Sequence, residues 1–115
     1  MSNLTTHVLD TSQGKPAEGM KIQLFKIEDQ KSVQLAEVIT NKDGRVDQKL
    51  LKSENNIGIY ELRFFAGDYF NKENLKLTKI KFLDEITIRF GISDDTHYHV
   101  PLLISPYGYS TYRGS

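Results

Sequence analysis

The segment HYHVPLLISPYGYSTYRGS, residues 97–115, decides the fold, because apolar and polar side chains alternate through its first half. Successive side chains of a β-strand point to opposite faces. One face of this strand carries an unbroken apolar row, namely Tyr98, Val100, Leu102 and Ile104. Such a row packs against a second sheet in a β-sandwich, so this face is predicted to cover the core.

The opposite face of the same strand combines histidines with apolar side chains, namely His97, His99, Pro101 and Leu103. The first predicted strand, LTTHVLD at residues 4–10, repeats this mixture on one face with Thr5, His7 and Leu9. An outer face that is half apolar is typical of a surface that a partner subunit covers. All three histidines of the chain lie on faces of this kind.

The rest of the chain also favours strands. Alternation or β-rich composition predicts further strands at residues 21–28, 33–40, 59–65 and 85–92. Tight-turn signals separate them, among them DQKS at 29–32 and Asp43-Gly44. A helix is predicted only at AGDYFNKEN, residues 66–74, where Asp68 could act as N-cap. We therefore predict an all-β fold, a sandwich of two antiparallel sheets, with residues 1–115 as a single domain.

The composition excludes several classes of function. Lys and Arg together number 15, as do Asp and Glu, so no basic surplus points to nucleic acid. The absence of cysteine excludes disulfides, thiolate metal sites and a cysteine nucleophile. No stretch has the length of a membrane span. The first residues lack a charged and apolar leader, so we expect a cytoplasmic protein, or a periplasmic one if a signal peptide has been removed.

The histidines are the natural proton carriers of a site without cysteine, because their pKa values lie near neutrality. Taken alone, His7 and His99 fit a structural role as well as a chemical one, and His97 fits a surface role better. His-x-His with a third histidine could also form a three-histidine zinc site. That site would need the three imidazoles to converge within one protomer, so zinc ranks second to a metal-free site.

Four short motifs resemble one family. THVLD at 6–10, GKPA at 14–17, DGR at 43–45 and the 97–115 segment together are similar to the transthyretin-related proteins, from Leu4 to Ser115. SPYGYST is shared with the transthyretin carriers and so indicates only the fold. The combination of His7, Arg45, His99 and a terminal YRGS is similar to the members of that family that hydrolyse 5-hydroxyisourate.

The resemblance implies a fold, an assembly and a reaction. The fold is a transthyretin-like sandwich of two four-stranded sheets with one short helix. The assembly is a homotetramer, a dimer of dimers, with active sites in the channel between the dimers. The reaction opens the cyclic amide of 5-hydroxyisourate to give 2-oxo-4-hydroxy-4-carboxy-5-ureidoimidazoline in urate catabolism, with water activated by histidine and without a cofactor.

The resemblance also implies roles for individual residues. His7, Arg45 and His99 would be catalytic, and His7 and Arg45 would also contact the substrate. The terminal residues Tyr112, Arg113 and Ser115 would hold the substrate or shape its pocket, although chain ends by default are loose. The alternative is a transthyretin-like carrier that binds a small aromatic ligand in the same channel without reacting.

Overall fold

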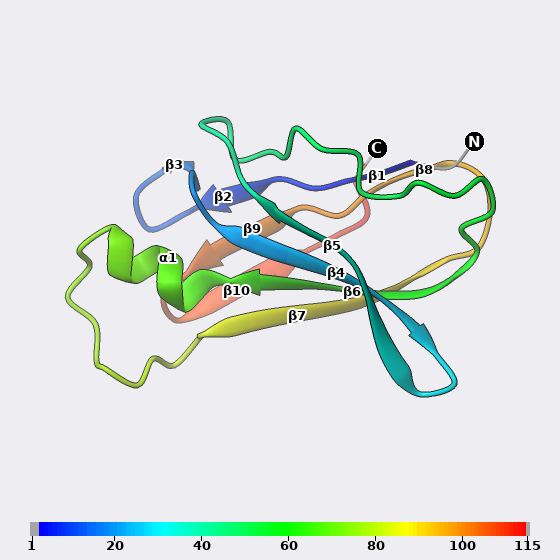
Figure 1. The fold of residues 1–115 in the computed structure, drawn as a ribbon. Coiled ribbons are helices and arrows are strands. Elements are labelled where there is room, and N and C mark those ends of the chain that lie inside the picture. Colours follow the sequence, from blue (N-terminus) through cyan, green and yellow to red (C-terminus); the bar gives the residue numbers. More distant parts are fainter. Residues whose placement is uncertain (1–2, 115) are drawn as a thin grey trace.

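The computed structural model describes residues 3–114 and arranges their strands in two layers (Figure 1). Within these residues the elements follow in the order β1 (Asn3–Thr5), β2 (Val8–Asp10), β3 (Lys15–Pro16), β4 (Lys21–Glu28), β5 (Lys31–Ile39), β6 (Gly58–Phe65), α1 (Ala66–Lys72), β7 (Glu85–Ile92), β8 (His97–His99), β9 (Leu102–Ser105) and β10 (Gly108–Thr111).

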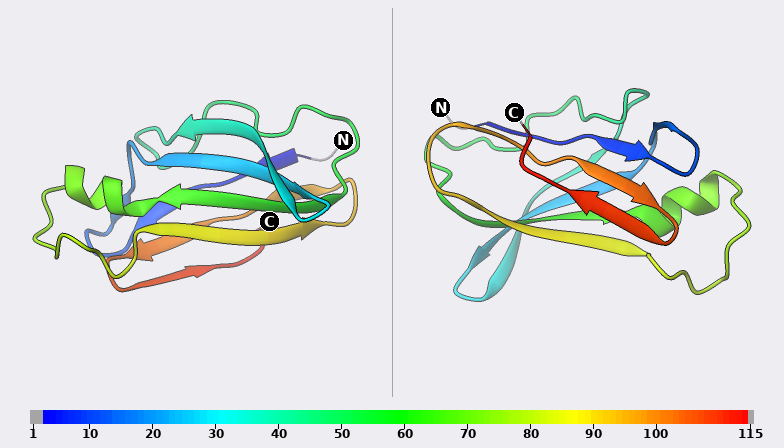
Figure 2. Two further views of the ribbon diagram at one scale, coloured as in Figure 1. Left: turned by 60° about the horizontal axis from the view of Figure 1, so that its bottom comes forward. Right: turned by 180° about the vertical axis from the view of Figure 1, so that it is seen from behind.

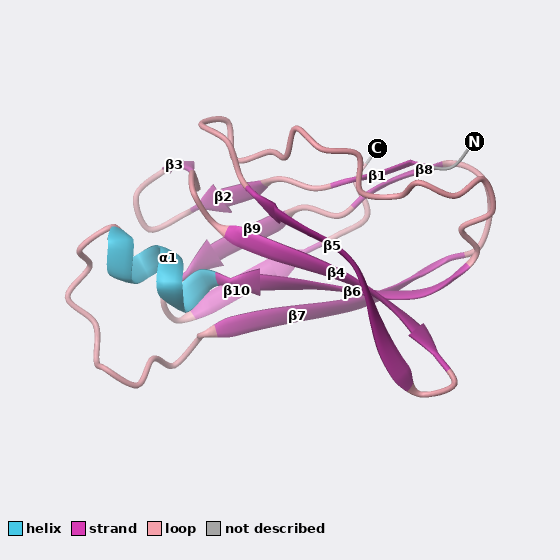
Figure 3. Cartoon of the chain, in the orientation of Figure 1, coloured by secondary structure: helices cyan, strands magenta, loops and turns pink. Residues whose placement is uncertain are grey.

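The strands form two four-stranded sheets, ordered β5-β4-β6-β7 and β10-β9-β2-β3. A two-stranded ribbon of β1 and β8 extends the second sheet toward the end of the molecule that lies away from α1 (Figures 2 and 3). The predicted sandwich of two four-stranded sheets with one short helix is therefore confirmed. The prediction that both sheets are antiparallel is wrong for the second sheet, in which β2 pairs with β9 in parallel.

Two long strands are each interrupted once. β1 and β2 continue one another, as do β8 and β9, and the two pairs run parallel. Hydrogen bonds bridge the interruption, from Val100 N–H to the Thr5 carbonyl at 2.9 Å and from Leu102 N–H to the His7 carbonyl at 2.9 Å. Pro101, which has no N–H to donate, lies within the interruption between β8 and β9. The parallel pairing lays the first strand against residues 97–105 and so brings the histidines together.

The core lies between the sheets, and the predicted apolar rows supply it. Each residue of the row at 98, 100, 102 and 104 is at most 5% exposed. From the facing sheet, Tyr60, Leu62 and Phe64 are at most 1% exposed. Full burial of one such side chain stabilises the fold by about 1.5–3 kcal/mol. The face assignment from alternation is confirmed, and it directs the histidines to the other face.

The prediction that Asp68 caps the helix is wrong. Helix α1 begins at Ala66, directly after β6, so Asp68 lies inside its first turn. Among the described residues, no side chain hydrogen-bonds the cap position. Gly67 N–H instead donates to the Asp84 carbonyl at 2.9 Å, which ties the helix to the segment before β7. Within residues 3–114, no helix is both long and apolar enough to cross a membrane.

Candidate active site

His7 and His99 meet on the face of the second sheet that points away from the core. His7 lies between β1 and β2, and His99 ends β8. Nδ1 of His7 and Nε2 of His99 are 2.8 Å apart, and the two rings stack with centroids 4.9 Å apart. His7 is half-buried and His99 is 9% exposed. Within residues 3–114, Nε2 of His7 has no hydrogen-bond partner, so it is free to meet a ligand.

The hydrogen-bonded chain continues beyond this pair. The Thr5 hydroxyl is 2.7 Å from Nδ1 of His99 and 2.7 Å from Nε2 of His97. Sequence reasoning missed Thr5, although it shares a strand face with His7. The signal lies in the parallel register, which sets Thr5 opposite His99.

A tight turn brings Arg45 to the same place. The Arg45 backbone forms an isolated bridge with His7, and Val8 N–H donates to the Gly44 carbonyl at 2.8 Å. Gly44 has φ of +73°, and a Cβ there would come within 2.5 Å of the Val8 carbonyl oxygen, so only glycine fits. The Asn41 side-chain oxygen accepts the Arg45 N–H at 3.1 Å and holds the turn. The exposed Arg45 thus stands beside the imidazole pair.

Both imidazoles of the pair are biased toward the neutral form. Burial, and then the charge of Arg45, lower the pKa of His7. Burial lowers the pKa of His99, with further lowering by His7, Arg45 and His97. A neutral imidazole carries a lone pair on one ring nitrogen and can accept a proton at neutral pH.

The segment after β10 covers His99. Gly114 N–H donates to the His99 carbonyl at 2.7 Å, in the same register that pairs Thr111 with Leu102. A Cβ at Gly114 would lie 2.5 Å from Cδ2 of the His99 ring. The glycine of YRGS is therefore needed for the chain to lie flat on the imidazole, a role that sequence reasoning missed.

Tyr112 and Ser115 were also predicted to hold the substrate. Register places Tyr112 opposite Pro101, hence on the same face as His99, and its side chain is 57% exposed. Ser115 lies outside the described residues.

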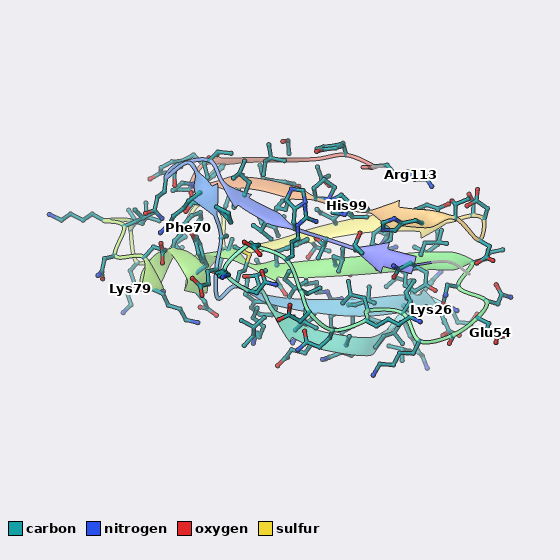
Figure 4. All side chains as sticks on the ribbon, turned by 90° about the horizontal axis from the view of Figure 1, so that it is seen from above. Lys26, Glu54, Phe70, Lys79, His99 and Arg113 are labelled. Carbon is teal, nitrogen blue, oxygen red and sulfur yellow. The ribbon has the colours of Figure 1, made fainter. Side chains whose placement is uncertain are left out.

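Arg113, by contrast, lies opposite Val100 and points to the other side of its strand. Its guanidinium lies 3.9 Å from the centroid of the Tyr98 ring and donates to the Thr96 hydroxyl at 3.0 Å. Figure 4 labels both Arg113, near the end of the chain, and His99. Within this chain the structure brings together His7, Arg45 and His99, but it does not bring Arg113 to them.

The zinc alternative gains no support from the arrangement of the rings. The three imidazoles form a chain with Thr5 rather than converging on one point, and both ring nitrogens of His99 engage in hydrogen bonds. Within the part of the chain that the structure describes, no group of three or more His, Cys, Asp or Glu side chains could hold a metal ion.

Comparison with known families shows which proteins this chain is related to. A model of the HIUase/Transthyretin family matches residues 4–114. The chain belongs to this family. Within the family, the 5-hydroxyisourate hydrolase of Pseudomonas aeruginosa is 53% identical over 117 residues, covering 100% of this chain and 93% of the relative.

Two solved structures show the same fold. The Klebsiella pneumoniae 5-hydroxyisourate hydrolase matches 100% of both chains, with a TM-score of 0.82 and 37% identity. The (S)-allantoin synthase structure matches 99% of this chain, with a TM-score of 0.93 and 45% identity, and this chain spans only 44% of that one. The family resemblance expected from the motifs is confirmed.

Proposed function

We propose that this chain hydrolyses 5-hydroxyisourate to 2-oxo-4-hydroxy-4-carboxy-5-ureidoimidazoline, a step of urate breakdown. Relatives named for this hydrolysis align over nearly the whole chain at 42–56% identity. The observation that carries the proposal is the 2.8 Å contact between His7 Nδ1 and His99 Nε2, next to Arg45. Hydrolysis of a cyclic amide needs a base, an oxyanion partner and an acid, and these three side chains can supply them.

His7 is the general base. When its Nδ1–H donates to His99, its Nε2 carries a lone pair directed away from the pair. This nitrogen takes a proton from water as the water oxygen bonds to the ring carbonyl carbon. His99 holds the tautomer and the ring orientation of His7, as the third member of a catalytic triad does.

Arg45 completes the reaction from the neighbouring turn. Its planar guanidinium matches the flat ring of carbonyl and amide groups and stabilises the oxyanion of the tetrahedral intermediate. The proton on His7 Nε2 then passes to the leaving ring nitrogen as the carbon–nitrogen bond breaks. His7 returns to its neutral form, and the reaction needs no cofactor.

The active form is a homotetramer, a dimer of dimers, with the site facing the channel between the dimers. This assembly is supported by the partial exposure of the face that carries the site when one chain stands alone. Leu9 and Leu103 are half-buried beside the site, and Arg45 and Tyr112 are exposed there. A partner subunit would complete a pocket in which Tyr112 and Ser115 contact the substrate.

The competing function is a carrier that holds a small aromatic ligand in this channel. A carrier is best served by apolar walls. This face instead presents a guanidinium and an imidazole pair with a free ring nitrogen. No observation favours the carrier over the hydrolase.

The test generates 5-hydroxyisourate in place with urate oxidase and follows its ultraviolet absorbance with and without this protein. Accelerated decay that a chelator leaves unchanged supports the metal-free hydrolase. Acceleration that the chelator removes would restore the zinc alternative. No acceleration by a folded tetramer would overturn the hydrolase and leave the carrier.

A further inference from the structure

The proposed hydrolysis requires His7 to accept a proton at a place where its charged form is disfavoured. The ring must take a proton from water, yet the causes that keep it neutral, burial and the nearby Arg45, also disfavour the imidazolium that forms. Burial and Arg45 also lower the pKa of His99, so the positive charge is disfavoured on His99 as well. A route that carries the charge away from Arg45 would lower the barrier of this step.

We propose that Thr5 and His97 form this route, a relay that moves positive charge from His7 through His99 to the exposed ring of His97. The inference rests on the proposed function, because it assigns how the base of that reaction tolerates its proton. The role of His97 was left open by the sequence, and Thr5 was not singled out at all.

The distances allow an unbroken chain of protons. His7 and His99 are 2.8 Å apart, and the Thr5 hydroxyl is 2.7 Å from each of its two imidazole partners. A hydroxyl has one hydrogen to donate and lone pairs to accept, so Thr5 accepts from one ring and donates to the other. If Nε2 of His7 is unprotonated, the direction of every hydrogen bond in the chain follows. The Nδ1–H of His7 donates to His99, and the Nδ1–H of His99 donates to Thr5. The Thr5 hydroxyl then donates to Nε2 of His97.

The transfer then balances without any added reactant. As His7 Nε2 takes the proton of water, its Nδ1 proton moves to His99 Nε2, and the His99 Nδ1 proton moves to Thr5. The hydroxyl proton of Thr5 moves to Nε2 of His97, which becomes the imidazolium. When His7 Nε2–H protonates the leaving nitrogen, all three protons move back, and each ring regains its starting tautomer.

The surroundings of His97 suit a transient cation. Its ring is exposed to solvent, whereas His99 is 9% exposed, so water can screen the charge. The Arg113 guanidinium donates to the His97 carbonyl at 3.3 Å. The Asp94 carboxylate, which accepts hydrogen bonds from Thr96, offsets this positive charge. These hydrogen bonds, and more weakly the charge of Arg113, lower the pKa of Asp94.

The experiment measures kcat, KM and the rate in mixtures of light and heavy water for the wild-type tetramer and its variants. A curved dependence of kcat on the deuterium fraction marks several protons in motion, and a straight line marks one. We expect a curve for the wild type. Thr5→Val should lower kcat about 10–100-fold with KM unchanged and give a straight line, because the hydroxyl link is lost.

Thr5→Ser restores a hydroxyl, so it should return kcat to within about threefold of the wild type, with the curve regained. The matched control is Thr6→Val, which removes the neighbouring hydroxyl that donates to the Val100 carbonyl at 2.6 Å. It should lower the melting temperature but keep the curve. His97→Gln, at an exposed position, should also give a straight line, and it carries the test if Thr5→Val does not fold.

A straight line for the wild type would overturn the relay, as would a curve in both Thr5→Val and His97→Gln. Failure of Thr5→Ser to restore the rate would show that the hydroxyl is not the cause of the loss. A wild-type protein that does not hydrolyse 5-hydroxyisourate at all would overturn the proposed function itself. The two failures are therefore distinguishable.

Discussion

Two polar residues of the first strand, three positions apart, are set up in opposite ways. Asp10 is 0% exposed, and its carboxylate accepts hydrogen bonds from the backbone and side chains of Ser12 and Gln13 and from the Tyr69 hydroxyl. His7 is half-buried, and within residues 3–114 its ring makes one hydrogen bond and leaves Nε2 open. Both carboxylate oxygens of Asp10 already accept hydrogen bonds, whereas Nε2 of His7 can still accept one from a ligand.

The pKa shifts express the same difference. Burial raises the pKa of Asp10, but the hydrogen bonds from Ser12, Gln13 and Tyr69 outweigh it, so the net pKa is lowered and the carboxylate stays ionised. Burial and Arg45 lower the pKa of His7, which stays neutral. Both groups are held deprotonated, but only His7 has a lone pair available to a substrate. A saturated buried group stabilises the fold, and an unsaturated one can react.

The largest expected effect is on turnover, when the partner of His7 is removed. His99→Gln should lower kcat about 10²–10⁴-fold, because the tautomer and orientation of the base are lost. The decay of 5-hydroxyisourate absorbance measures this loss. Circular dichroism and gel filtration should show a folded tetramer, and a kcat within threefold of the wild type would contradict the assignment.

Removing the saturated carboxylate should instead affect stability. Asp10→Ala leaves the buried Tyr69 hydroxyl and the nearby N–H groups without their acceptor, which costs about 2–4 kcal/mol of unfolding free energy. Urea unfolding at pH 7 measures the loss. Asp68→Ala, at an exposed position in α1, is the matched control and should change the free energy by less than about 0.5 kcal/mol. Equal effects of the two variants would contradict the proposed structural role of Asp10.

A smaller loss of activity is expected where the chain crosses His99. Gly114→Ala would place a methyl group against the His99 ring and displace it, so kcat should fall about 10–100-fold. Gly108→Ala is the control, since its nearest neighbour, the Ser105 hydroxyl, would lie 3.8 Å from the new Cβ. The ratio of the two kcat values isolates the contact, and a ratio near one would refute its importance.

The smallest expected effect is a shift in pH dependence. Because the pKa of His7 is lowered, the acid limb of kcat/KM should lie below about pH 6.5, where free histidine titrates. Arg45→Gln removes one cause, so the limb should move upward although the overall rate falls. Stability follows the same sign, since lowered histidine pKa values favour folding above pH 6.5 and lose this contribution as the pH falls. A limb that stays in place in Arg45→Gln would contradict the electrostatic account.

Alternation in the sequence was sufficient to predict a β-sandwich, although not the parallel pairing of β2 with β9. It placed Tyr98, Leu102 and Ile104 in the core, and the structure buries all three. It could not locate the start of α1, because Asp68 is a plausible cap whose position depends on where β6 ends. Local patterns report which face a side chain occupies but not where an element stops.

The site was predictable only in part for a related reason. Alternation put His7 and His99 on outer faces, but their contact depends on the parallel register of segments about 90 residues apart. Arg45 entered through the family resemblance alone. Thr5 and Gly114 were missed because a threonine on a strand and a glycine near a chain end have no chemical signature until the register is known.

The most direct test compares the initial rate of 5-hydroxyisourate decay, per folded molecule, in His99→Gln and Asp10→Asn side by side. We expect folded His99→Gln to be nearly inactive, whereas Asp10→Asn should be less stable but turn over within about threefold of the wild type. A fully active His99→Gln, or a folded Asp10→Asn as inactive as His99→Gln, would contradict the assignment of the imidazole pair as the catalytic centre.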